Sequence, residues 1–302
     1  MKPSKVEISK QGLNWQAAII LFLKGFFMGA ADVIPGVSGG TIALIVGIYE
    51  ELIDTISRYD GQMLTLLWQR KWKALFQRMN LSFLMPLGLG ILMAIFSLAK
   101  LMTYLLSYHE SLTYAVFFGL ILGSVFLMAR DFQKNLTNLG LLIFGAVFTF
   151  GLVGLLPMET PKTLIAFFTS ALIAICAMIL PGISGSFILL LLGKYKQVME
   201  VVKSPFAGDH IWFVLVFALG ALIGIIGFSK LLKWLLRHYH NALFAFLIGM
   251  MLGSLRKLWP FTGIDFSIGS IAGRIFLMLI GLAAVYLIYR AENYRTAKCR
   301  SN

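Results

Sequence analysis

Most of the chain consists of apolar segments separated by short polar stretches. The first begins near Trp15, and the others cover residues 40–49, 83–106, 112–129, 138–156, 163–180, 183–193, 211–229, 241–255 and 268–289. A helix needs about 20 residues to cross the hydrocarbon core of a bilayer, and several of these segments are long enough. The pattern predicts an all-α polytopic membrane protein that forms a single membrane domain over residues 1–302.

The composition excludes other classes of protein. Hydrophobic residues make up 59% of the chain and charged residues only 13%, whereas a soluble domain is about one quarter charged. The net charge is +13, but the chain has no polar domain that could carry a nucleic-acid-binding surface. The excess of basic residues therefore indicates basic cytoplasmic loops and contact with anionic lipids. The two cysteines and four histidines have no metal-ligand spacing, and we expect no metal and no cofactor.

Two of the apolar segments are too short to span a bilayer, and each follows a Pro-Gly break. The breaks read Pro-Gly-Val-Ser-Gly-Gly at 35–40 and Pro-Gly-Ile-Ser-Gly-Ser at 181–186. Backbone groups freed at membrane depth must be satisfied by protein, water or ligand. We therefore predict re-entrant hairpins over about 17–57 and 163–199, with a pair of kinked spanning helices as the alternative.

The breaks belong to a longer internal duplication. Residues 31–49 align with 177–195 at an offset of 146, and residues 89–124 align with 219–254 at an offset of 130. The two halves cover about 11–150 and 160–292. Gly-x-x-x-Gly spacings, as at Gly25 and Gly29, predict close helix packing.

Each half is predicted to hold one hairpin and three spanning helices. Three is odd, so the second half enters the membrane upside down, as in the inverted-repeat plan of secondary transporters. With the N-terminus inside, seventeen basic residues lie on the inner side and seven on the outer side. The positive-inside rule then predicts a multi-pass protein with both termini in the cytoplasm.

The tips of the two hairpins are the candidate ligand site. Glycines let the backbone approach a ligand, serines supply hydroxyl groups, and each break is followed by helix N–H groups without partners, which favour an anion such as phosphate. The alternative is that the small residues only allow tight packing at a kink. The candidate phosphate-binding residues are Pro35, Gly36, Ser38, Gly39, Gly40 and Thr41 in the first tip and Pro181, Gly182, Ser184, Gly185 and Ser186 in the second.

Charged residues within apolar segments are the candidates for gating or proton coupling. They are Lys24, Asp32, Glu50, Lys100 and Lys230. Asp32 precedes the first tip and is predicted to take up a proton or to pair with Lys24, and a purely structural pair is the alternative. For Lys100 and Lys230, snorkelling to the membrane interface is an alternative to guiding a headgroup. Residues 61–80, with their tryptophans and basic residues, predict an amphipathic helix on the cytoplasmic membrane surface.

The segments Ala-Asp-Val-Ile-Pro-Gly-Val-Ser-Gly-Gly-Thr at 31–41 and Leu-Pro-Gly-Ile-Ser-Gly at 180–185 resemble the paired signatures of the PopT family of bacterial polyprenyl-phosphate transporters. The resemblance implies a transporter in the bacterial cytoplasmic membrane that returns undecaprenyl phosphate from the outer to the inner leaflet, and no enzymatic activity. It leaves homo-oligomerisation open.

The sequence leaves two alternative functions. Undecaprenyl-diphosphate phosphatases share re-entrant tips, but Gly39 and Gly185 stand where the arginine of their signature would be. A secondary transporter of ions or small anions is the other alternative.

Overall fold

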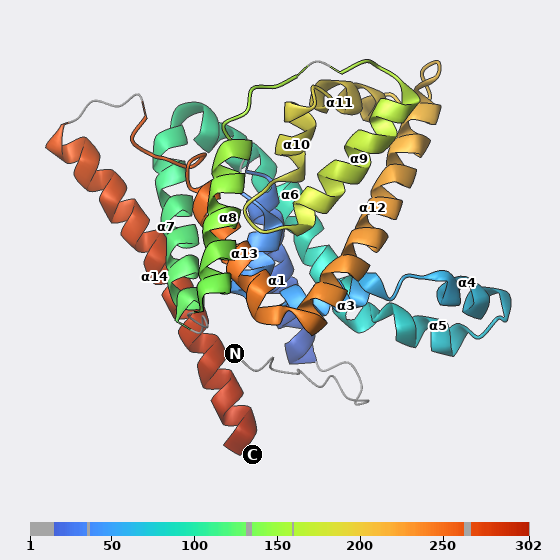
Figure 1. Ribbon diagram of the computed structural model, residues 1–302, viewed down its shortest axis with the longest axis horizontal. Coiled ribbons are helices and arrows are strands. Elements are labelled where there is room, and N and C mark those ends of the chain that lie inside the picture. The colour runs from blue at the N-terminus through green and yellow to red at the C-terminus, as the bar shows by residue number, and fades with distance from the viewer. Residues whose placement is uncertain (1–14, 35–36, 131–134, 159, 263–266, 302) are drawn as a thin grey trace.

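The computed structural model describes residues 15–34, 37–130, 135–158, 160–262 and 267–301. This part of the chain forms fourteen α-helices and no strands (Figure 1). Four helices are long and apolar enough to cross a membrane, namely α6 (Leu81–Tyr108), α7 (Glu110–Ala129), α12 (His210–His238) and the Ile268–Arg290 part of α14 (Ile268–Ser301). The chain is therefore an all-α polytopic membrane protein, as its sequence predicts.

Both Pro-Gly breaks interrupt helices. In the first half, α1 (Trp15–Asp32) is followed by the short α2 (Gly39–Ile45) and by α3 (Tyr49–Ser57). In the second half, α9 (Leu164–Ile179) is followed by α10 (Gly185–Leu191) and α11 (Tyr195–Lys203). Helices α8 (Leu136–Leu152) and α13 (His240–Ser254) complete the bundle. Residues 180–184 are not helical, so the second break separates α9 from α10.

Residues that are equivalent in the two halves have similar backbone angles. Gly47 and Gly193, 146 residues apart, have φ angles of 70° and 65°, a left-handed conformation that glycine adopts without strain. His109 and Tyr239, 130 residues apart, precede α7 and α13 with φ and ψ of −137° and 36° and of −134° and 40°. Helices α2 and α10 each have seven residues, and α3 and α11 each have nine.

Glycines allow the closest helix contacts, as the spacing predicts. A Cβ atom on Gly25 would lie 2.1 Å from the Leu87 carbonyl oxygen of α6, and one on Gly220 would lie 2.4 Å from the Phe168 carbonyl oxygen of α9. These contacts join helices of the same half. Two further contacts cross between the halves, because α7 packs on α14 and α13 packs on α8.

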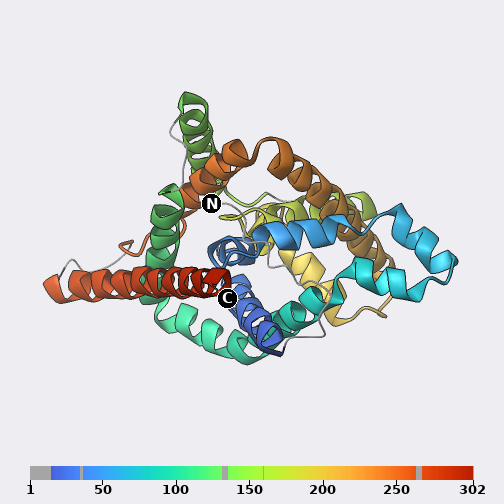
Figure 2. The ribbon, with the colours of Figure 1, turned by 90° about the horizontal axis from the view of Figure 1, so that it is seen from below.

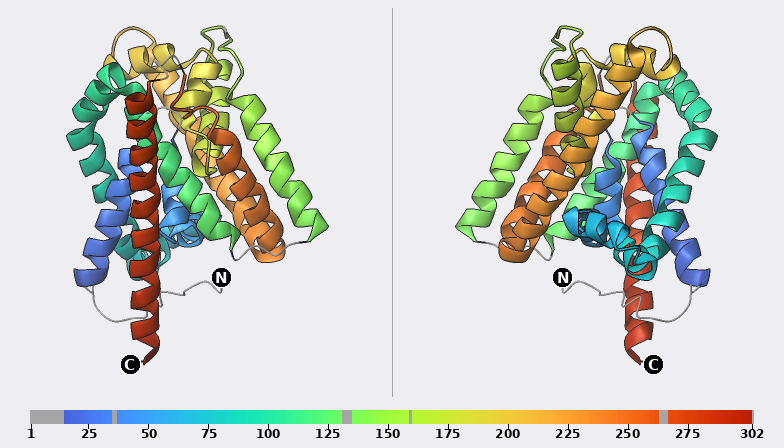
Figure 3. Two further views of the ribbon diagram at one scale, coloured as in Figure 1. Left: turned by 90° about the vertical axis from the view of Figure 1, so that its left-hand side faces the viewer. Right: turned by 90° about the vertical axis from the view of Figure 1, so that its right-hand side faces the viewer.

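The hairpin ends lie at opposite ends of the molecule. Helix α3 lies at the end where α1 begins and α14 finishes, and α11 lies at the other end (Figure 1). Helix α14 runs along the outside of the bundle (Figure 3). We call these the α3 end and the α11 end.

The segment at 61–80 projects sideways from the α3 end (Figure 2). It forms two helices, α4 (Gly61–Trp68) and α5 (Trp72–Met79), so the single helix expected from its sequence is wrong. The chain turns between them at Arg70, whose φ is 53°. Trp68 and Trp72 are exposed, beside the exposed Arg70 and Lys71.

Candidate functional site

The two hairpin tips meet in the core of the bundle. The Ser38 hydroxyl donates to the carbonyl oxygens of Met178 at 3.3 Å and Leu180 at 3.2 Å, and the Gly182 N–H donates to Thr41 Oγ1 at 2.9 Å. A Cβ atom on Gly40 would lie 2.6 Å from the Ile179 carbonyl oxygen. The structure thus brings together tip residues that are about 140 positions apart in the sequence.

At the first tip, the helix N–H groups already have partners within the chain. The Gly39 N–H donates to Asp32 Oδ1 at 2.7 Å, and the Gly40 N–H donates to Ser38 Oγ at 3.1 Å. The Thr41 N–H donates to the Ser38 carbonyl oxygen at 2.9 Å. A carboxylate therefore caps α2 at the place where the sequence suggested that an external anion would bind.

The second tip lacks this cap. Met178 stands at the position that aligns with Asp32, and Ser184 makes no side-chain cap on α10. Instead its hydroxyl lies 2.8 Å from that of Ser186. Within the described residues, the N–H groups of Gly185, Ser186 and Phe187 have no hydrogen-bond acceptor. The second tip thus presents three free N–H donors beside two hydroxyls.

The second tip is also tightly constrained by its neighbours. Gly182 has a φ of 90°, and a Cβ atom there would lie 2.8 Å from the Met250 carbonyl oxygen of α13. Pro181 is buried and Gly185 packs against the Ala174 carbonyl. Pro35 and Gly36, the matching pair of the first tip, lie outside the described residues.

Among the five charged candidate residues, Asp32 lies at the first tip and the other four lie elsewhere. Lys24 donates to the Val46 carbonyl oxygen at 2.5 Å, at the C-terminal end of α2, whereas Asp32 caps the N-terminal end of that helix. Glu50 lies 2.9 Å from His240 at the α3 end. Lys100 and Lys230 are exposed on α6 and α12, as a snorkelling side chain would be.

Three features were missed at the sequence level. The Lys257 ammonium lies 5.8 Å from the ring centroid of Phe187, which belongs to the first turn of α10, so a cation lies close to that turn. The second feature is Lys194, which follows α10 and is fully buried.

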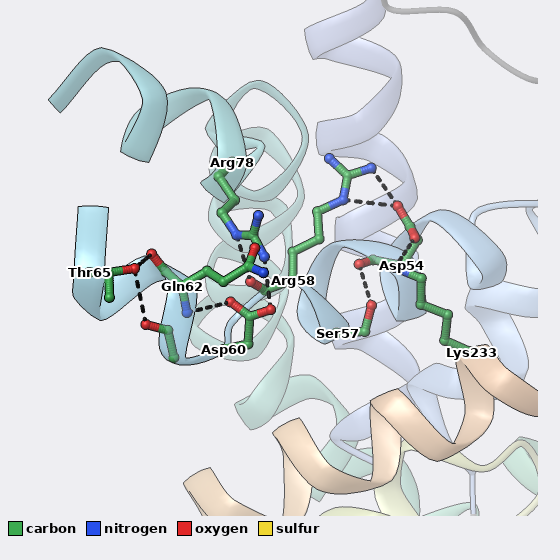
Figure 4. Close-up of polar contacts among 9 residues, drawn as sticks. Asp54, Ser57, Arg58, Asp60, Gln62, Thr65, Arg78 and Lys233 are labelled. Atoms are coloured by element: carbon green, nitrogen blue, oxygen red, sulfur yellow. Dashed lines mark hydrogen bonds and ion pairs between the residues drawn. The ribbon is translucent and has the colours of Figure 1, made fainter. Parts of the chain in front are cut away.

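The third feature is Asp54 of α3, which lies between Arg58 and Lys233 (Figure 4). The Lys233 Nζ atom is 2.7 Å from Asp54 Oδ1. In the sequence, only the four-residue spacing of Asp54 and Arg58 pointed to part of this cluster.

Broken helices that meet inside a bundle of spanning helices are typical of membrane transporters. The family comparison agrees with that class. The model of the undecaprenyl phosphate translocase-like family matches residues 28–276, and the chain belongs to this family. The resemblance inferred from the tip sequences is thereby confirmed, and the family is one of transporters rather than enzymes.

Two curated relatives cover most of the chain. A polyprenyl-phosphate transporter of Vibrio cholerae is 48% identical over 240 residues, which are 79% of this chain and 77% of the relative. A polyprenyl-phosphate transporter of Staphylococcus aureus is 38% identical over 258 residues, 80% of this chain and 86% of the relative. No solved structure matches the chain.

Proposed function

We propose that the protein translocates undecaprenyl phosphate from the outer to the inner leaflet of the bacterial cytoplasmic membrane. Family membership supports the substrate class, and the observation that carries the mechanism is the uncapped second tip in the core. A bare phosphate in hydrocarbon faces a solvation cost on the order of tens of kcal/mol. The isoprenoid tail can stay in lipid throughout, so the protein has to shelter only the headgroup.

The headgroup is bound at the second tip. The N–H groups of Gly185, Ser186 and Phe187 and the hydroxyls of Ser184 and Ser186 supply donors, and hydrogen bonds to a charged group contribute about 1.5–3 kcal/mol each. Ser38 and Thr41 of the first tip hold the second tip in place through their hydrogen bonds. Lys257 is the cation that draws the phosphate toward α10.

The two halves, 11–150 and 160–292, form an inverted repeat with hairpins over 17–57 and 163–199. The supporting observations are the matched turns at Gly47 and Gly193, the opposite placement of α3 and α11, and the reciprocal packing of α7 on α14 and of α13 on α8. Rocking of one half against the other would expose the tips to each side in turn.

The α3 end faces the cytoplasm, and both termini lie on that side. The exposed tryptophans of α4 and α5 then rest in the headgroup layer, with Arg70, Lys71 and Lys73 against anionic lipids.

Transport is tested in liposomes that carry labelled undecaprenyl phosphate in one leaflet. We expect leaflet exchange well above that of protein-free vesicles, since the tips lower the barrier for the headgroup. Ser184→Ala should slow exchange by roughly tenfold, the loss of one charge-assisted hydrogen bond. Exchange no faster than in protein-free vesicles, with folded protein present, would refute the function.

The same assay at two pH values examines proton coupling by Asp32. Asp32→Asn keeps an oxygen to accept from Gly39, so the tip should stay folded while the ionisable group is lost. Exchange that depends on pH in the parent and not in Asp32→Asn is expected. An unchanged pH profile removes the coupling and leaves the transport function intact.

The orientation is tested with single cysteines in place of two exposed residues, Gln62 on α4 and Ser107 near the end of α6. Gln62→Cys should react with an impermeant thiol reagent only from the cytoplasmic side, and Ser107→Cys only from outside. Ser38→Cys and Ser184→Cys, buried at the tips, should react slowly from either side. Labelling of positions 62 and 107 from the same face would contradict the topology.

A further inference from the structure

The two ends of the molecule differ in how tightly they are closed. At the α3 end, α3 packs along α12 (Figure 2). The matching helices at the α11 end, α11 and α6, are described throughout and make no comparable contact. The structure is therefore closed between the halves at the α3 end and unclosed at the α11 end.

Two polar contacts between side chains of different halves tie the α3 end together. His240 Nε2, at the start of α13, lies 2.9 Å from Glu50 Oε1 in the first turn of α3. Lys233 of α12 lies 2.7 Å from Asp54, which also pairs with Arg58 (Figure 4). All these contacts except the one with Arg58 join the first half to the second.

The duplication places a second acid and base at the α11 end, at the positions that match Glu50 and His240. Glu50 aligns with Lys196 at the offset of 146, and His240 aligns with Glu110 at the offset of 130. Lys196 lies in the first turn of α11 and Glu110 is the first residue of α7, the same helix positions as in the formed pair. The acid lies in the first half in both pairs of positions, but it is on α3 in the first pair and on α7 in the second. Each pair therefore again combines one acid with one base.

This second pair is unformed. Lys196 and Glu110 are both exposed, and no ion pair joins them, whereas Glu50 and His240 are half-buried. The other cross-half pair has no such counterpart, because Lys233 aligns with the uncharged Thr103. Glu200, which aligns with Asp54, pairs with Lys162 at 3.5 Å on the surface.

We propose that Glu110 and Lys196 form an ion pair in a second conformation, in which the α11 end is closed and the contact between Glu50 and His240 is broken. This inference rests on the proposed transport function and names the residues that stabilise its two states. The contact between His240 and Glu50 and that between Lys196 and Glu110 then form alternately at opposite ends. Each state has contacts that the other lacks, as an equilibrium between two conformations requires.

Paired cysteines test the second conformation in the reconstituted protein, with Cys176 and Cys299 replaced by Ala. Glu110→Cys with Lys196→Cys should form a disulfide under mild oxidation when the α11 end closes, since two cysteines can be bridged once their Cα atoms come within about 7 Å. The bond should stop lipid exchange, and reduction should restore it. Failure of this pair to oxidise, while Glu50→Cys with His240→Cys does so, would overturn the inference.

Exchange by the cysteine-free parent is measured in parallel. That rate reports on the proposed function by itself, so a failure of transport and a failure of the second pair are distinguished.

Charge reversal gives an independent test. Glu110→Lys and Lys196→Glu should each slow exchange by up to about fivefold, the range for one exposed ion pair. The double variant should recover most of the parent rate. Glu200→Lys, a matched reversal on α11, should leave the rate near that of the parent. A double variant no faster than the slower single variant, with all proteins folded, would refute the pairing.

Discussion

Replacing Gly182 by Val is expected to destabilise the protein severely and to abolish lipid exchange. Gly182 has a φ of 90°, and any Cβ atom there would lie 2.8 Å from the Met250 carbonyl oxygen and 3.2 Å from the Met251 nitrogen. Both neighbours are backbone atoms of α13 and cannot rotate away. A β-branched residue in this conformation costs about 1–2 kcal/mol, and overpacking adds about 1–3 kcal/mol. Thermal unfolding in detergent and the liposome assay measure the two effects.

Gly227→Val is the matched control for this substitution. Gly227 is exposed on α12, and a Cβ atom there would meet nothing within 4 Å. Its valine variant should unfold within a few degrees of the parent and should still exchange lipid. Equal unfolding temperatures for the two variants would mean that the contact between the second tip and α13 is not rigid.

A second large effect is expected for Lys194→Met. Lys194 is fully buried, and its ammonium donates to the Pro161 carbonyl oxygen at 2.5 Å, to Gln197 Oε1 at 2.8 Å and to the Thr160 carbonyl oxygen at 3.3 Å. It also lies 5.0 Å from the ring centroid of Phe167. Methionine fills much of the same volume but leaves these acceptors without a donor. The free energy of unfolding should fall by about 1–3 kcal/mol, the cost of leaving such acceptors without a partner.

Lys203→Met supplies the comparison for Lys194→Met. Lys203 lies in the last turn of α11 and is exposed, so its loss should change the free energy of unfolding by no more than about 0.5 kcal/mol. Thermal unfolding of the two variants in the same detergent gives the difference. If Lys194→Met unfolds at the temperature of Lys203→Met, Lys194 does not anchor the segment at 160–161 to the second hairpin.

The free donors of the second tip could not be read from the Pro-Gly-x-Ser-Gly motif. The motif is nearly the same in both halves, and both tips were expected to offer helix N–H groups to an anion. The difference arises from one aligned position, Asp32 against Met178, because a carboxylate can reach the Gly39 N–H and a thioether cannot cap a helix. The sequence shows that the two halves differ at this position. The folded structure shows the consequence, which is that α2 is capped by a carboxylate and α10 is not.

The sequence by itself determined the class of protein, the positions of the breaks and the family. These follow from local properties: hydrophobic length sets which segments can cross a bilayer, and a Pro-Gly pair disfavours a helix because proline lacks an N–H and glycine has low helix propensity. The glycine spacings likewise predicted close helix contacts, but they named no partners.

The tertiary structure decided which distant groups meet. Lys194 and Lys196 lie in one polar run of the sequence, yet the first is fully buried and the second is exposed. Lys24, placed by helical spacing near Asp32, instead donates to the Val46 carbonyl at the far end of α2. The packing of α7 on α14 and of α13 on α8 could not be predicted from the sequence either. Burial and pairing depend on contacts between segments far apart in the chain, and local periodicity carries no information about those contacts.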